Sequence, residues 1–104
     1  MSQELSAELL EIENKIGKLE SKIEEVEESI NEKYDAYSRL KKGTFESYDS
    51  FEARSSKAES AFRQYDQRQT AYIKEMRKDV TDLQERKKKI NEQLYAGLDE
   101  SEDF

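Results

Sequence analysis

The chain has 104 residues, of which 41% are charged, a formal net charge of −7 at pH 7, and no Cys, His, Pro or Trp. Without Cys and His, the usual zinc ligands and most nucleophile and general-base arrangements are missing, so we expect neither an enzyme nor a bound metal or other cofactor. The negative charge argues against nucleic acid as a ligand, because phosphate binding needs a surplus of Lys and Arg on one face. No apolar run is long enough to cross a bilayer, and the first residues do not resemble a Sec-type signal peptide. We therefore expect a chain that starts in the cytoplasm and does not insert into a membrane.

The first forty residues carry an apolar pattern with alternating spacings of four and three. Its two columns hold Leu5, Leu9, Ile12, Ile16, Leu19, Ile23, Val26, Ile30, Tyr37 and Leu40, with Lys33 as the polar exception. A strand would alternate with a period of two, and a disordered segment has no reason to keep this pattern over five heptads. The two columns predict the seam of a coiled coil, on a helix over about residues 3–42.

The pattern stops near Gly43, which predicts a turn. Gly can adopt the left-handed backbone conformation that ends a helix. Lys41 and Lys42, just before it, suit the negative end of the helix dipole. We therefore expect the chain to reverse direction around Gly43 and Thr44.

A second helix is predicted over about residues 45–96. Thr44 or Ser47 is expected to cap it, with Glu46 in its first turn. Gly97 and the acidic residues after it are expected to end this helix and leave a flexible acidic tail at residues 99–104.

The second half supplies a matching set of apolar side chains. They are Tyr48, Phe51, Ala58, Phe62, Tyr65, Ile73, Met76, Val80 and Leu83. Antiparallel pairing of residues whose numbers total about 88 brings nearly every apolar position of one half opposite one in the other, such as Tyr37 opposite Phe51 and Leu9 opposite Val80. The same orientation places the acidic first helix beside the basic residues 74–89. The predicted fold is all-α, a single antiparallel two-helix hairpin domain over residues 1–98.

In that register several apolar side chains have no counterpart within the hairpin. The second helix is expected to extend past the start of the first. Its apolar stripe continues there through Ile90, Leu94, Tyr95 and Leu98, which have no residue opposite them. The aromatic side chains also exceed what one seam can bury; they are Phe45, Tyr48, Phe51, Phe62, Tyr65 and Tyr72. A two-helix core is marginal against chain entropy. We therefore expect these side chains to bind a further helical surface, either another protein or a second copy of the chain.

The end of the second helix reads Tyr95-Ala96-Gly97-Leu98-Asp99, in which Tyr95 and Asp99 share one face if the helix persists. With its hairpin architecture and turn glycine, the chain resembles the small helical proteins of type VII secretion systems, whose turn carries Trp-x-Gly and whose tail carries Tyr-x-x-x-Asp/Glu. The turn here reads Lys41-Lys42-Gly43, so the Gly matches and the Trp does not. The chain is therefore most similar to the Trp-less partners of LXG toxins, often called Lap proteins.

This resemblance implies a non-catalytic partner that binds the helical N-terminal domain of an LXG-type toxin and helps direct it to export. Tyr95 and Asp99 would belong to a C-terminal secretion signal presented to the secretion ATPase. The protein would then leave the cytoplasm by a Sec-independent, type VII route. Two alternatives stay open: a homodimeric structural coiled-coil module, and a cytoplasmic chaperone or adaptor with no export role.

Overall fold

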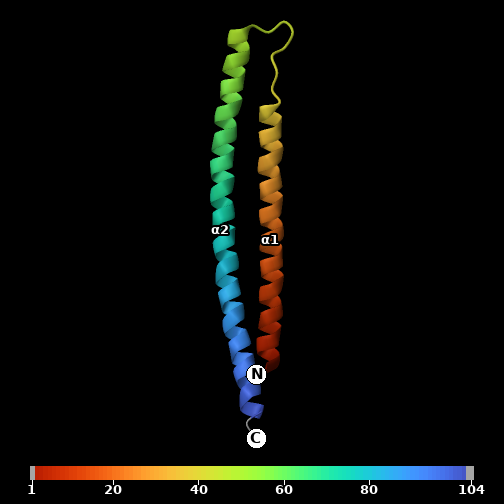
Figure 1. Ribbon diagram of the computed structural model, residues 1–104, viewed down its shortest axis with the longest axis vertical. Coiled ribbons are helices and arrows are strands. Elements are labelled where there is room, and N and C mark those ends of the chain that lie inside the picture. Colours follow the sequence, from red (N-terminus) through yellow and green to blue (C-terminus); the bar gives the residue numbers. More distant parts are fainter. Residues whose placement is uncertain (1, 103–104) are drawn as a thin grey trace. The chain divides into compact units, whose positions relative to one another are not determined.

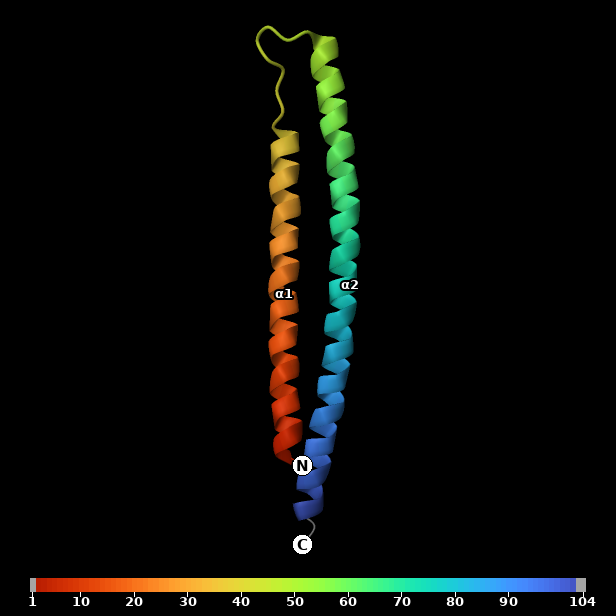
Figure 2. The same cartoon turned by 180° about the vertical axis from the view of Figure 1, so that it is seen from behind.

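The computed structural model describes the backbone of residues 2–102 and the side chains of residues 3–96. The chain forms two helices, α1 (Ser2–Ser38) and α2 (Tyr48–Glu102), joined by a loop over residues 39–47. Contacts divide it into two compact units, unit 1 (Met1–Ile23 with Glu75–Phe104) and unit 2 (Glu24–Lys74). In each unit a segment of α1 lies beside an antiparallel segment of α2 (Figures 1 and 2). The predicted all-α helical hairpin is confirmed, while the single domain over residues 1–98 stays a prediction.

The seam is the face that the structure buries. In unit 1 the buried side chains are Ile12, Ile23, Met76, Val80 and Ile90. In unit 2 only Val26 and Ile73 are buried, and the seam positions nearer the loop are half-buried. Lys33, the polar exception in the pattern, is exposed. The heptad spacing thus identified the packed face of α1 correctly.

Charge pairs in unit 1 agree with the antiparallel orientation. Arg86 donates a hydrogen bond to the carboxylate of Glu8, and Lys87 Nζ lies 3.4 Å from Glu13 Oε1. These pairs join the acidic α1 to the basic segment of α2, as the sequence predicts. Because each exposed pair contributes only about 0.2–1 kcal/mol, their main effect is to favour one orientation over the other.

The register of the hairpin differs from the predicted one. Partners on the two helices have residue numbers that total 94 for Glu8 with Arg86 and 99 for Tyr37 with Phe62, where the sequence predicts about 88. The expected pairing of Tyr37 with Phe51 is therefore wrong. Because an apolar heptad pattern repeats, one helix can slide past the other by whole repeats and still place apolar side chains opposite each other. The apolar pattern alone therefore does not determine the register, which also depends on the loop between the helices.

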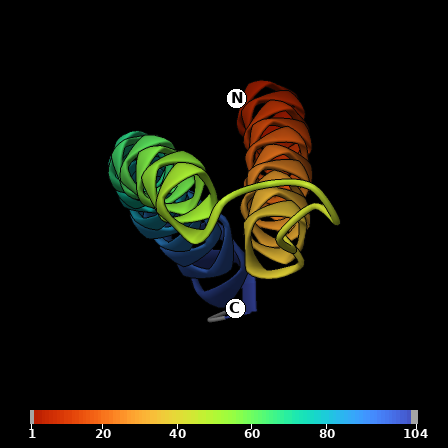
Figure 3. The same cartoon turned by 90° about the horizontal axis from the view of Figure 1, so that it is seen from above.

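Helix α1 ends at Ser38, earlier than the predicted residue 42. The N–H of Arg39 still donates to the carbonyl oxygen of Asp35 at 3.1 Å, whereas the N–H of Leu40 donates to that of Tyr37 at 3.3 Å, three residues back instead of four, so the α-helical pattern stops here. No residue with a positive φ occurs in the described backbone, so the left-handed conformation expected of Gly43 is wrong. The chain instead continues beyond the end of α1 (Figure 1) and then crosses to α2 in the loop that Figure 3 shows from above.

Helix α2 begins at Tyr48, three residues later than predicted. Ser47 caps it, because its Oγ accepts the backbone N–H of Ser50 at 3.1 Å. The expectation for Ser47 is confirmed, but Glu46 lies in the loop and not in the first helical turn.

The altered register also shortens the predicted overhang of α2. Ile90, expected to lie beyond the hairpin, keeps only 3% of its surface exposed, and Leu94 is half-buried. Ile90 follows Arg86 by one helical turn, and Arg86 lies beside Glu8, so this part of α2 still lies against α1. The expectation that these two side chains have no counterpart in the hairpin is therefore wrong.

Helix α2 continues to Glu102, past the point where the sequence predicted a flexible tail. A single Gly97 costs a helix only about 1 kcal/mol, and the residues after it include no helix breaker of the proline type. The predicted tail is not confirmed. Asp103 and Phe104 lie outside the described residues, as do the side chains of Leu98 and Asp99.

A cysteine crosslink distinguishes the two registers, since the natural chain contains no Cys. We expect a short bifunctional thiol reagent to crosslink the Leu9→Cys/Ile90→Cys variant, which follows the register of the structure. The matched variant Leu9→Cys/Val80→Cys follows the predicted register, and its α2 position lies about 15 Å away along the helix. Efficient crosslinking of the second variant, but not of the first, would contradict the structure.

Candidate protein-binding surface

The chemistry of the seam changes toward the loop. Eight of the ten aromatic residues lie between Tyr34 and Tyr72, and Leu40 is the only Leu, Ile, Val or Met within residues 31–72. No side chain in that stretch is buried, whereas Val26 before it and Ile73 after it both are. This part of the hairpin therefore packs with aromatic rings and small residues, and leaves its apolar surface only partly covered.

Unit 2 contains an apolar groove of about 490 Å³ between its two helical segments. Residues from one face of each segment and from the start of the loop line it; they are Lys33, Ala36, Tyr37, Leu40, Ala58, Ala61, Phe62, Tyr65 and Arg68. We call this the aromatic groove. Its alanines leave room between its aromatic rings.

Ring contacts hold one wall of the aromatic groove in place. The rings of Tyr37 and Phe62 are stacked, with centroids 5.8 Å apart and planes 1° apart. Tyr34 tilts against Phe62 at 5.6 Å. The hydroxyl of Tyr65 shares a hydrogen bond with that of Ser29 across the two helices. Aromatic pairs of this kind are worth about 0.5–1.5 kcal/mol beyond the area they bury, so the wall is largely preformed.

Two cations lie at the end of the aromatic groove farther from the loop. Lys33 Nζ lies 4.8 Å from the centroid of the Tyr65 ring, in a cation–π contact. Arg68 makes no hydrogen bond or ion pair with the part of the chain that the structure describes. No carboxylate lines the groove. Its polar edge is therefore positive in a chain whose net charge is −7.

A second aromatic surface, which we call the tip, consists of Phe45, Tyr48 and Phe51. The side chain of Phe45 is fully exposed (102%), and that of Tyr48 is 67% exposed. Phe51 is half-buried, with Arg54 Cζ 5.5 Å from its ring centroid. A shallow hollow of about 400 Å³ adjoins Tyr48 and Phe51. Exposed aromatic rings gathered at one end of a helix pair are typical of an interaction surface.

Arg54 and Glu46 fix the loop that carries the tip. The guanidinium of Arg54 donates to both carboxylate oxygens of Glu46, at 3.1 and 3.0 Å, and to the carbonyl oxygen of Lys41 at 2.9 Å. Glu46 Oε1 also accepts the N–H of Gly43 at 3.0 Å. These bonds lower the pKa of Glu46 to about 2, chiefly through Arg54 and next through Gly43. The loop is thus tied to α2 on both sides of Phe45.

The predicted binding residues fall into separate groups. Phe62 and Tyr65 line the aromatic groove, while Phe45, Tyr48 and Phe51 form the tip. Tyr72 is 45% exposed but lines neither the groove nor the hollow at the tip. Ile90 is buried, so it has no exposed surface with which to bind a partner. Tyr95 is 66% exposed on α2.

Sequence reasoning missed three polar members of this region. Arg54 reaches back eight residues to Glu46, a spacing that no helical rule suggests, because Glu46 lies outside the helix. The apolar pattern marks Lys33 only as a polar exception in the seam, and nothing in it distinguishes Arg68. Their positions at the groove follow from the register, which the apolar pattern could not supply.

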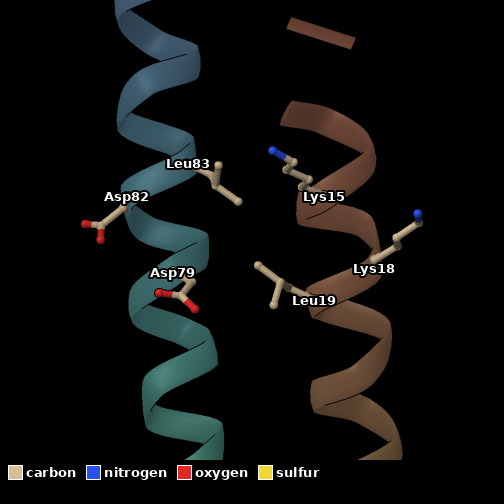
Figure 4. Close-up of a pocket in the computed structure, with 6 residues that line it drawn as sticks. All are labelled: Lys15, Lys18, Leu19, Asp79, Asp82 and Leu83. Carbon is tan, nitrogen blue, oxygen red and sulfur yellow. The ribbon is translucent and has the colours of Figure 1, made fainter. Parts of the chain in front are cut away.

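Unit 1 has a shallow groove of a different kind. Leu19 and Leu83 point toward the opposite helix in it, whereas Lys18 and Asp82 point outward (Figure 4). Charges of both signs line this groove, from Lys15 and Lys18 on α1 and Asp79 and Asp82 on α2. This groove runs along the exposed edge of the seam. Because its charges have both signs, they favour neither an anionic nor a cationic ligand.

In the described residues no group of acidic, His or Cys side chains is placed to hold a metal ion. Over the same range neither helix has an apolar stretch long enough to cross a membrane. A scan against protein-family models and searches of curated proteins and of solved structures find no match to the chain.

The titration of Glu46 tests the loop contacts. Because its pKa is lowered, the ionised clamp is complete above about pH 4.5 and is lost as the pH falls through about 2. We expect the NMR signal of the Glu46 carboxyl to titrate with a midpoint near 2, and Arg54→Ala to move that midpoint back toward 4.5. A midpoint near 4.5 in the natural chain would mean that Arg54 does not hold Glu46 in solution.

Proposed function

We propose that this protein is a non-catalytic binding partner of another helical protein, and that the tip and the aromatic groove form its binding surface. The observation that carries the proposal is the run of unburied, mostly aromatic apolar side chains between Tyr34 and Tyr72, in a hairpin that buries aliphatic side chains elsewhere. A third helix packed against unit 2 would cover these rings. Large aromatic residues such as Tyr are also enriched among the interface residues that contribute most of the binding free energy.

The more specific form of the proposal follows the resemblance to the partners of LXG toxins. The partner is then the helical N-terminal domain of a type VII secreted toxin, and the hairpin helps to direct it to the export machinery. Tyr95 supports this form because its ring is 66% exposed and free to contact another protein. Residues 95–99 are helical in backbone, which is compatible with Tyr95 and Asp99 sharing one face.

The direct experiment is co-expression with the products of the neighbouring genes, followed by affinity capture. We expect a protein with a long helical N-terminal domain to be recovered. Phe45→Ala should weaken that complex about five- to thirtyfold, the cost of truncating a central aromatic by about 1–2 kcal/mol. Because Phe45 is fully exposed, the substitution removes no packing from the hairpin.

The matched control is Leu10→Ala, which removes another exposed apolar side chain, 59% accessible, from unit 1. It should leave the affinity of the complex unchanged, as measured by titration calorimetry. Equal affinities for the natural chain and the Phe45→Ala variant would exclude the tip from the binding surface. Recovery of the chain only as its own dimer would instead favour a structural coiled-coil module.

The export role makes a separate prediction. Tyr95→Ala and Asp99→Ala should abolish secretion while helix content and capture of the partner stay unchanged, because Tyr95 is exposed and contributes little to the core. Secretion is measured as the fraction of the protein in the culture supernatant, with Glu92→Ala as a neighbouring control on the same helix. Undiminished secretion of both variants would leave a cytoplasmic chaperone or adaptor as the better account.

A further inference from the structure

We infer that the aromatic groove takes an amphipathic helix whose apolar stripe is flanked by carboxylates, supplied by a second protein. The inference rests on the proposed binding function and adds the chemistry of the partner. It follows from the shape of the groove and from the sign of the charges that line it.

The groove has the dimensions and periodicity of a helix-binding site. On α1, Lys33, Ala36 and Tyr37 lie three and four residues apart, so they share one face. On α2 the lining residues run from Ala58 to Arg68, which spans about 15 Å at 1.5 Å per residue, close to three helical turns. Two parallel stripes of this length suit a third helix lying along both.

The alanines decide where such a helix would sit. Ala58 and Ala61 lie one turn apart on α2, and Ala36 lies on α1. Small side chains let a neighbouring helix approach closely, and its apolar side chains would then pack against the stacked rings of Tyr37 and Phe62. Because those rings already stack on each other, little ordering is needed when a partner binds.

Charge specifies the partner further. Lys33 and Arg68 are the lining residues farthest from the loop on their respective helices, so both cations lie at the same end of the groove. A partner with carboxylates at that end would give Arg68 an ion pair that it lacks within the described residues. A partner with Lys or Arg there would meet uncompensated like charge, and such mismatches suppress wrong pairings.

Asp66 and Glu59, the carboxylates close to the groove along α2, do not line it and form no ion pair with Lys33 or Arg68 within the described residues. Asp66 accepts a hydrogen bond from the Thr70 hydroxyl at 3.3 Å, and Glu59 pairs with Arg63. Each of these carboxylates has its partner on its own helix. The groove therefore presents its two cations to an incoming chain.

A second copy of this protein suits the groove less well. In a two-fold dimer the same patch lies on both sides of the interface. An aromatic groove facing another aromatic groove would bring four cations together without a carboxylate from either lining. The complementary charge must therefore come from a different surface.

The test uses two synthetic helical peptides with the same leucine stripe at positions i, i+3, i+4 and i+7. One carries glutamates beside the stripe and the other carries lysines. Fluorescence anisotropy measures the binding of each labelled peptide to the full chain. We expect the glutamate peptide to bind at least about fivefold more tightly, and the double variant Lys33→Glu/Arg68→Glu to reverse that preference.

The matched control is the double variant Lys57→Glu/Lys78→Glu, which makes the same change in net charge at exposed lysines outside the groove. It should keep the preference for the glutamate peptide, and circular dichroism should give equal helix content for all variants. Equal binding of the two peptides, binding of neither, or the same loss in both double variants would overturn the inference. So would a dimer of this chain, detected by sedimentation, that dissociates on Arg68→Glu.

The inference and the proposed function can fail separately. If the natural partner still loses affinity on Phe45→Ala while the peptides show no charge preference, the binding function stands and the acidic helix is excluded. If Phe45→Ala has no effect but the peptides behave as expected, the groove binds acidic helices and the tip has no part in binding.

Discussion

Two packed helices can bury only one stripe of side chains each, and the rest of this structure follows from that constraint. Unit 1 meets it with aliphatic side chains such as Ile12, Met76 and Ile90, which are small enough for one seam to enclose. Unit 2 supplies aromatic rings and alanines instead, and a two-helix seam cannot enclose the larger rings. Burial therefore stops at Val26 on α1 and resumes at Ile73 on α2. The rings left between them form the surface on which the proposed function depends.

Contacts of the loop position these exposed aromatic side chains. Arg54 and Glu46 tie residues 41–46 to α2, and the side chain of Phe45 in this stretch is fully exposed. The same loop sets the register that brings Phe62 onto Tyr37 and Tyr65 beside Ser29. A change in the loop would therefore alter the aromatic groove as well as the tip. The same contacts therefore stabilise this region and determine the shape of the binding surface.

The sequence predicted the parts of the fold that depend on local pattern. Heptad spacing identified the buried face of α1, with Lys33 as its polar exception, and Ser47 was one of the two residues expected to cap α2. It could not predict the register, because a repeating pattern matches itself at several offsets. Because the predicted register was wrong, Ile90 was expected to have no counterpart on α1, and the contact of Tyr37 with Phe62 was not expected. The left-handed conformation predicted for Gly43 was wrong because Gly permits that conformation but does not require it.

The central claim is that unit 2 is completed by another protein. Hydrogen–deuterium exchange of the chain alone and in its captured complex tests this claim most directly, because amide protection reports which backbone segments are held closed. We expect fast exchange between residues 30 and 72 in the free chain and a large gain of protection there in the complex. Residues 5–23 and 75–94 should change little. Protection gained only in those last two segments, or nowhere, would contradict the account.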